Sequence, residues 1–540
     1  MNGRAGAPVD SPPHPSLRST APTGAEGNRA GASSTEGLPE HGPPAAAKGS
    51  STTERVVVPL LVIGAVVLGA TLRLLMFTGK VGEINADEAV IGLMARAVLH
   101  GDIAVFYWGQ TYGGSLETLL LAPIVAVFDG RLALQILPAI ESVAVVALTF
   151  AVARRILDRQ GALLAAALAW IYPLSAVYFS TRQMLFYLPI TIFGLAMMWA
   201  ALVLAEDRHR SRWWFGAGLA AGLGWWCSPQ ILLFALPVAA WLLARLRAGV
   251  LAGWPALLGG VVGASPWLVY HGLHPDTPFV AQPVGGEGTY VDHLRLFGTE
   301  GLPLVLGLRH MMSLQWVIPG GRVALVLVAL IVLAAFLRPV ARRSIHLWVL
   351  AAYPFLLSLS PSASYVGNGR YLFFLAPVLA ITLMHGAGHL VPRSVVLVAG
   401  AALTLTASGV VLTWPYPRFS NAAPTGDLQR AMAAMDVDRA VSGYWVTYKL
   451  MYDSDQEILV APLGSDRSPE ITSTVLSSSR IAYVYATIFD GWEQHVAEAQ
   501  EALASRGIES TVAEVPGYAL LVPRETVRPS DLPGSALPPS

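Results

Sequence analysis

A series of long apolar segments constrains the fold of this 540-residue chain more than any other feature. Eleven such segments follow one another between residues 56 and 414. A helix needs about 17–25 residues to cross the hydrocarbon core of a bilayer, and most of the segments reach that length. The sequence therefore predicts a polytopic α-helical membrane protein with about eleven transmembrane helices, at 56–77, 131–153, 161–180, 183–205, 213–227, 230–244, 250–270, 321–337, 346–360, 371–390 and 394–414.

Charge and cysteine content exclude several classes of function. Only 13% of the residues are charged, against about 25% in typical soluble domains. The formal net charge is zero, which gives no electrostatic support for a nucleic-acid partner. Cys227 is the only cysteine, so the chain has no internal disulfide and no cysteine-rich metal site.

The placement of arginines predicts the orientation of the segments. Residues 1–54 are rich in Pro, Gly, Ala, Ser and Thr without an apolar run, and we expect a disordered cytoplasmic tail. Because cytoplasmic loops are enriched in Arg and Lys, we expect a multi-pass plasma-membrane protein with this tail inside. The short outside loops then carry one arginine or none, and the inside loops carry Arg154, Arg155, Arg159, Arg208, Arg210, Arg212, Arg245, Arg247, Arg338, Arg342, Arg343 and Arg393.

Residues 301–318 are also apolar, but they do not fit this alternation as a twelfth span. Inserting them would reverse the orientation of every later segment and place Arg338, Arg342 and Arg343 outside. Arg309 and His310 also lie in the middle of the stretch. We therefore expect an external helix that lies in the membrane interface.

The composition changes after Trp414. Short runs typical of strands alternate with stretches typical of helices, a pattern that predicts a small α/β domain at 416–525. Eleven spans from a cytoplasmic start place this domain outside the membrane, and we expect 526–540 to be a flexible tail. The strand-like runs are Ala440–Tyr444, Glu457–Pro462, Ile481–Ala486, Ser510–Val515 and Tyr518–Pro523.

The first external loop, residues 79–130, carries the most suggestive carboxylates. Asn85 or Asp87 could cap the N-terminus of a helix, because both side chains accept bonds from unpaired helix N–H groups. Alternatively, Asp87 is a general base for an acceptor hydroxyl at the membrane surface. Glu88 is then a second catalytic group, a hydrogen-bond partner, or a solvated side chain.

The second half of this loop supplies candidates for a substrate cavity. Ser115–Phe128 is too short to span the bilayer and suits an interfacial helix, on which Glu117 faces the cavity or water. Tyr107, Trp108 and Tyr112 form a sugar-stacking surface or belong to the aromatic belt at the membrane interface. Gln110 lies among these aromatic residues and is assigned to the same cavity.

Two outside arginines are candidates for phosphate binding. Arg182 and Gln183 follow the third segment, and Arg370 and Tyr371 begin the tenth. A guanidinium group offers a planar fork of donors that matches phosphate, although snorkelling to lipid headgroups explains these arginines equally well. We predict that Arg370, Tyr371 and Arg182 bind a donor phosphate and that Gln183 lines the cavity. Glu141, inside the second segment, is either a functional acid or a packed partner of another helix.

The order of these features resembles the GT-C membrane glycosyltransferases, close to the protein O-mannosyltransferase and aminoarabinose transferase branch. The resemblance lies in Asp87–Glu88, in Phe128–Arg131 and in Gly369–Tyr371 with Pro377, on a topology covering residues 55–415. It implies that Asp87 is catalytic, that Arg370 contacts a lipid phosphate, and that a polyprenyl-phosphate sugar is the donor. No cofactor is certain, and a divalent metal stays open. The Lys-Pro-Pro-like run of many relatives is missing here, at Tyr112–Glu117.

The expected function is therefore inverting transfer of a sugar from a polyprenyl phosphate to an extracytoplasmic hydroxyl. The acceptor is a glycan, a lipid or a protein. A transporter or lipid flippase is the main alternative, because it would also explain many spans and external basic groups. A non-catalytic scaffold is the third reading, and it predicts that Asp87 and Arg370 are freely replaceable.

Overall fold

The structure is a computed structural model. It describes residues 52–79, 82–278, 286, 288–311, 313–337, 343–390, 398–402, 405–406, 409–410 and 423–539. The expected cytoplasmic tail lies outside the described residues apart from its last three positions. Most of the expected eleventh segment, 394–414, also lies outside them.

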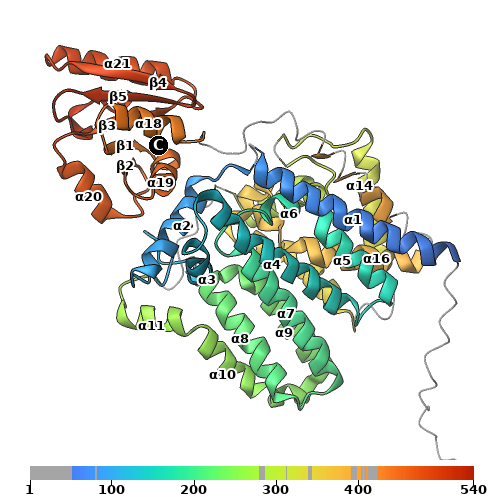
Figure 1. The fold of residues 1–540 in the computed structure, drawn as a ribbon. Coiled ribbons are helices and arrows are strands. Elements are labelled where there is room, and N and C mark those ends of the chain that lie inside the picture. The colour runs from blue at the N-terminus through green and yellow to red at the C-terminus, as the bar shows by residue number, and fades with distance from the viewer. Residues whose placement is uncertain are drawn as a thin grey trace, which may run out of the picture. The chain divides into compact units, whose positions relative to one another are not determined.

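Helices form at the apolar segments, because a helix satisfies its own backbone hydrogen bonds where water is absent. They surround a continuous apolar core that runs from α1 to α16 (Figure 1). The helices are α1 Thr52–Thr78, α4 Gly130–Ala153, α5 Arg159–Ile171, α6 Leu174–Phe179, α7 Tyr187–Glu206, α8 Ser211–Cys227, α9 Leu232–Leu246, α10 Trp254–Gly263, α11 Ser265–Leu273, α14 Gly321–Phe336, α15 Ile345–Ser358 and α16 Leu375–Leu390.

Fewer of these helices than expected are long enough to cross a membrane alone. Among the described residues, four helices have the length and apolar composition of a span, or six if two bent helix pairs each count as one. The pair α10 and α11 is bent by 57°. The segment 161–180 is divided into α5 and α6 at Pro173, which has no N–H to continue a helix. The structure supports a membrane protein and does not confirm eleven spans.

Glycines allow α8 and α10 to pack at close range. A Cβ atom on Gly218 would lie 1.9 Å from the carbonyl oxygen of Ala256, and one on Gly263 would lie 2.5 Å from that of Leu219. Such small residues on facing helices let the backbones approach each other, as in many membrane helix pairs.

The expected interfacial helix at 301–318 is wrong for most of its length. Only α13, Leu302–Val305, continues as an α-helix after the π-turn Phe297–Gly301. Gly307 then takes a positive φ of 60°, which ends the helix, and an isolated antiparallel bridge joins Arg309 to Trp316. The apolar composition of this stretch therefore reflects burial in a compact loop.

The C-terminal region is the α/β domain that the sequence predicts. Its five strands are β1 Arg439–Gly443, β2 Leu459–Leu463, β3 Ala482–Ala486, β4 Ser510–Val515 and β5 Tyr518–Pro523. They form one sheet in the order β2-β1-β3-β5-β4 (Figure 1). The first three strands are parallel, and β5 is antiparallel to both β3 and β4. The helices are α18 Gly426–Ala434, α19 Tyr444–Asp453, α20 Pro469–Ser477 and α21 Trp492–Ser505.

The last residues are not the flexible tail that the sequence suggests. Val527, Leu532 and Ala536 are buried in an apolar cluster with strands β3 and β5 and helix α21. The sequence does not predict this packing, because the segment is polar and rich in proline and its three buried apolar residues do not form a periodic pattern.

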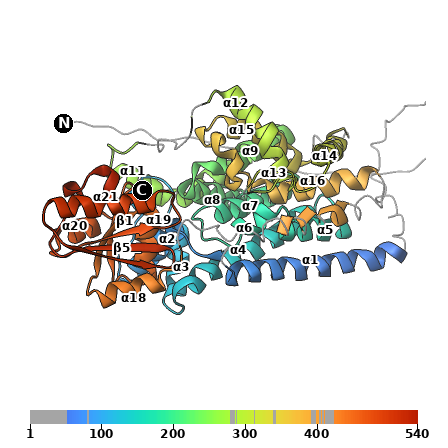
Figure 2. The same ribbon diagram turned by 90° about the horizontal axis from the view of Figure 1, so that it is seen from above.

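A second apolar cluster joins the segment 82–130 to the C-terminal domain. Helix α2, Ala86–Leu99, packs against α19, and Figure 2 shows the two helices side by side. Gly92 makes this contact close, since a Cβ atom there would lie 2.4 Å from the ring of Tyr452. Helix α3, Leu116–Val125, is the short helix expected in the same loop.

Candidate active site

The beginning of α2 fixes the direction of the Asp87 carboxylate. The Asn85 side chain caps this helix by accepting a bond from the Glu88 N–H at 3.1 Å, and Glu88 Oε2 accepts from the Asn85 N–H at 2.9 Å. Of the two capping residues that the sequence allows, the structure selects Asn85. Asp87 therefore does not cap the helix, and its half-buried carboxylate is available to other groups.

Two tyrosines hold Asp87. The Tyr444 hydroxyl, at the start of α19, donates to Asp87 Oδ1 at 2.6 Å. The Tyr107 hydroxyl lies 3.3 Å from that of Tyr444 and 3.4 Å from the Asp87 carbonyl oxygen. Burial and the adjacent carboxylate raise the pKa of both phenols, so both are protonated and able to donate.

Two guanidinium groups interact electrostatically with the same carboxylate. Burial disfavours the charge of Arg370, but Tyr187, Tyr371 and Asp87 raise the pKa of its guanidinium above the ordinary value. Burial likewise disfavours the charge of Arg467, and interactions with tyrosine hydroxyls and Asp87 raise its pKa. Both arginines therefore stay charged within electrostatic range of Asp87.

Arg467 belongs to a further group of polar and aromatic side chains. Its guanidinium carbon lies 5.2 Å from the ring centre of Tyr107 and 5.6 Å from that of Tyr444. The Gln110 amide, oriented with its oxygen towards Arg467, accepts from the guanidinium at 2.7 and 3.0 Å and from the Tyr112 hydroxyl at 3.2 Å. Trp108 is partly buried against the adjacent apolar cluster.

The other predicted residues form a separate buried network. Arg182 Nη2 lies 2.5 Å from Glu88 Oε2, and the two side chains are 2% and 4% exposed. The Gln183 backbone N–H donates to Glu88 Oε1 at 3.3 Å, and its side-chain amide donates to Glu117 Oε1 at 2.9 Å. Burial and the neighbouring carboxyl of Glu141 raise the pKa of Glu117 well above its usual range. This network links α2, α3, α4 and the loop after α6.

The predicted site residues thus fall into two groups. Arg370, Tyr371, Tyr112 and Gln110 belong with Asp87, whereas Glu88, Arg182, Gln183 and Glu117 form the separate buried network. Trp108 belongs to neither group and packs against the apolar cluster.

Sequence reasoning missed Tyr444 and Arg467. A signal for both was present, because Tyr444 ends the strand-like run Ala440–Tyr444 and Arg467 lies shortly after the run Glu457–Pro462, near strand ends where loops of α/β sheets bind ligands.

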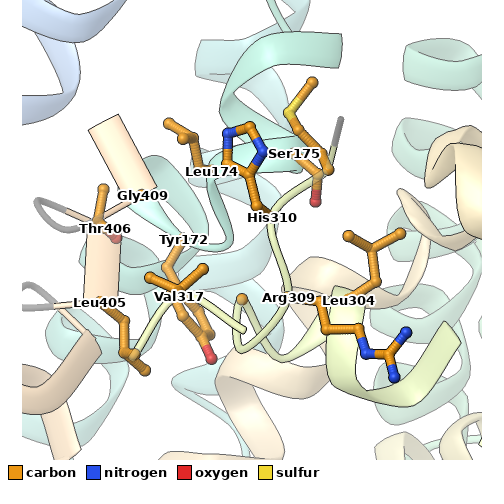
Figure 3. A pocket seen from close by; sticks show the side chains of 12 residues that line it. Tyr172, Leu174, Ser175, Leu304, Arg309, His310, Val317, Leu405, Thr406 and Gly409 are labelled. Carbon is orange, nitrogen blue, oxygen red and sulfur yellow. The ribbon is translucent and has the colours of Figure 1, made fainter. Parts of the chain in front are cut away.

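Two hollows in the described residues lie apart from Asp87. One is lined by residues such as Tyr172, Arg309 and His310, and it contains none of the predicted site residues (Figure 3). The other is an apolar groove at the start of α9 and the end of α15, lined by Pro229, Gln230, Leu232, Leu233, Leu356, Leu357, Leu359 and Ser360. Within the described residues, no group of three or more His, Cys, Asp or Glu side chains is placed to hold a metal.

Comparisons with known proteins extend this picture. Residues 118–270 match the family model described as dolichyl-phosphate-mannose-protein mannosyltransferase. No curated protein sequence matches the chain. The structure is similar to ArnT from Cupriavidus metallidurans in the apo state, with a TM-score of 0.61, 12% identity and coverage of 88% of this chain and 99% of that chain.

Two further solved structures are similar. ArnT from the same organism bound to undecaprenyl phosphate gives a TM-score of 0.58, 13% identity and the same coverage of 88% and 99%. The oligosaccharyltransferase of Archaeoglobus fulgidus gives a TM-score of 0.50 and 12% identity over 85% of this chain and 72% of that chain. The chain therefore has the GT-C fold of membrane glycosyltransferases, which confirms the resemblance predicted from its sequence.

Proposed function

We propose that this chain is a membrane glycosyltransferase that moves a sugar from a polyprenyl phosphate to an acceptor hydroxyl on the extracytoplasmic side. The observation that carries the proposal is the half-buried Asp87 carboxylate, which accepts a hydrogen bond from Tyr444 and interacts electrostatically with Arg370 and Arg467. A carboxylate beside two cations suits a reaction in which one group takes a proton and another stabilises a leaving phosphate. The mannosyltransferase family match at residues 118–270 supports the same class of chemistry.

The donor follows from the similar proteins and from the charges of the site. ArnT, which shares the fold, has been solved with undecaprenyl phosphate bound. In this chain, Arg370 is the guanidinium that we assign to the donor phosphate, with Tyr371 beside it. The prenyl chain would occupy the apolar groove between α9 and α15, because η6, Pro361–Asn368, leads directly from that groove to Arg370.

The reaction is a direct displacement at the anomeric carbon. The acceptor oxygen forms a bond to this carbon while the bond to the phosphate oxygen breaks and its electron pair stays on the phosphate. Asp87 takes the proton of the acceptor hydroxyl, and the configuration at the anomeric carbon inverts. Arg370 offsets the charge that develops on the leaving phosphate.

Glu88 and Arg182 have a different role in this proposal. Their two side chains are buried and form an ion pair with each other, and Glu88 also accepts hydrogen bonds from two backbone N–H groups. We therefore infer that they position α2 and that Arg182 is not the phosphate ligand. Gln183 and Glu117 extend the same support to α3.

The test is transfer by the purified full-length chain from polyprenyl-phosphate sugars, with Asp87→Asn as the variant. Asp102→Asn is the matched control, since Asp102 is an exposed carboxylate of the same loop. We expect Asp87→Asn to lower transfer by about 10²–10⁴-fold and Asp102→Asn to keep it. Full activity of Asp87→Asn would show that Asp87 is not the general base. If the wild-type chain released no polyprenyl phosphate from any of the donors, the proposed function would be refuted.

A further inference from the structure

We propose that the C-terminal domain builds the acceptor subsite, with Arg467 as an acceptor-binding residue, and that this subsite takes an uncharged carbohydrate. The proposal rests on the proposed function and assigns the acceptor class. It begins with the sheet topology. Tyr444 directly follows β1, and Arg467 lies in the loop after β2. Because β1 and β2 are parallel neighbours, these loops share the carboxyl edge of the sheet, where open α/β sheets bind their ligands.

This edge of the domain meets the first external loop at the proposed general base. Tyr444 donates to Asp87, and Gly109 packs against the loop that carries Arg467. A Cβ atom on Gly109 would lie 2.8 Å from the Asp466 carbonyl oxygen and 3.1 Å from the Arg467 Cα, and its φ is +67°. Glycine is therefore needed for the approach. An acceptor that reaches Asp87 from this side must contact the C-terminal domain.

The exposed side chains at this junction suit a sugar ring. Tyr107 and Tyr444 are almost fully buried, so they serve as the base of the site. Arg467 lies against their rings, Gln110 accepts from Arg467 and Tyr112, and all three side chains are only partly buried. They combine an aromatic side chain, an amide and a guanidinium, which together offer apolar contact and several hydrogen bonds to hydroxyl groups. Arg467 Nε is buried without a bond within the described structure, which leaves donor capacity in this group.

The balance of charge favours a neutral acceptor. Asp87 and a donor phosphodiester carry two negative charges, which Arg370 and Arg467 offset. After transfer, the phosphate monoester carries both negative charges and Asp87 is protonated, so the balance holds. The nearby cations Arg182 and Lys449 already have carboxylate partners, in Glu88 and in Glu83 with Asp453. An anionic acceptor would leave one negative charge without a partner in a partly buried site, which is costly.

Tyr444 has a separate task as a positioning residue. Its hydroxyl occupies Asp87 Oδ1, which leaves Oδ2 to take the acceptor proton. Tyr444→Phe should therefore lower the rate of transfer at saturating acceptor by about tenfold. It should leave the affinity for the acceptor within twofold, since the phenyl ring keeps its packing.

Binding to the full-length chain in lipid nanodiscs tests the subsite. The probes are undecaprenyl phosphate, a panel of neutral methyl oligoglycosides, and the matching uronates. We expect Arg467→Gln to weaken the binding of the best neutral glycoside about tenfold and the binding of undecaprenyl phosphate at most threefold. Arg370→Gln should show the reverse pattern. Arg524→Gln is the control, because Arg524 is an exposed arginine of the same domain.

The outcomes separate this proposal from the proposed function. Absence of binding by every neutral glycoside, or tighter binding of the uronates, would overturn the acceptor class. If Arg467→Gln weakened the binding of undecaprenyl phosphate as strongly as Arg370→Gln does, Arg467 would be part of the donor site and the assignment of the acceptor subsite would be wrong. If the wild-type chain bound neutral glycosides but not undecaprenyl phosphate, the donor and the proposed function would fail instead.

Discussion

The buried ion pair of Glu88 and Arg182 offers a strong test of how the site is held. Glu88→Gln keeps the shape of the side chain but removes the carboxylate charge that pairs with the Arg182 guanidinium, which is 2% exposed. Removing one partner of a buried pair typically costs about 3–5 kcal/mol, because the remaining charge is desolvated and unpaired. We expect that loss for Glu88→Gln, measured by the unfolding of detergent-solubilised protein through its tryptophan fluorescence.

Substitution of the other partner, Arg182→Gln, should lower the free energy of unfolding by less, and the size of this loss should depend on pH. In Arg182→Gln the remaining group is a carboxyl, which can neutralise itself by binding a proton, whereas a guanidinium cannot. Burial already raises the pKa of Glu88, against the lowering effect of Arg182 and two backbone N–H groups. Without Arg182, the folded state should bind a proton that the unfolded chain releases near its usual pKa. The stability of Arg182→Gln should therefore fall as the pH rises from 5 to 8.

The double variant completes the argument. Glu88→Gln with Arg182→Gln replaces two charges by two amides that can bond to each other, so it should be more stable than Glu88→Gln alone. If this double variant also regains transfer activity, the pair positions α2 and takes no part in the chemistry. A cost of less than about 1 kcal/mol for Glu88→Gln, or a larger cost for Arg182→Gln at pH 5, would refute this reasoning.

Three further predictions concern single positions. Asp87→Asn should lower transfer by about 10²–10⁴-fold, the usual contribution of a general base, with an unchanged unfolding midpoint. Gly92→Ala should destabilise the chain by about 1–3 kcal/mol in the same unfolding assay, because a Cβ atom there would lie 2.4 Å from Tyr452. The raised pKa of Glu117 means that the folded wild-type chain keeps a proton that the unfolded chain releases, so the wild type should lose stability as the pH rises above about 4.5. Glu117→Gln should remove this loss, which unfolding midpoints measured across pH would reveal.

Each of these has a specific contradiction. Retained activity of Asp87→Asn would mean that another group is the general base. Gly64→Ala is the control for Gly92→Ala, because nothing lies within 4 Å of its added Cβ, and equal effects would mean that helix propensity alone is measured. A Glu117→Gln variant whose pH dependence matches the wild type would mean that Glu117 is ionised in the folded chain.

Much of the architecture could be predicted from local patterns. The apolar segments at 56–77 and 131–153 became helices α1 and α4, and the strand-like run Tyr518–Pro523 became β5 with the same bounds. These elements depend on hydrophobic length or alternation, which are visible in the sequence. The stretch 301–318 failed because an apolar composition does not distinguish a helix from a buried loop, and Gly307 decided the outcome.

The site was predicted only on its membrane side, and the reason is sequence separation. Asp87 and Tyr444 share a hydrogen bond across 357 positions, and Glu83 and Lys449 share an ion pair across 366. No periodicity links residues so far apart, so reasoning on one loop reaches the carboxylate but not its partners. Since Tyr444 donates a hydrogen bond to the proposed base, we infer that the C-terminal domain contributes to the site and is more than a removable cover. Removing it should cost activity even where the membrane helices stay folded.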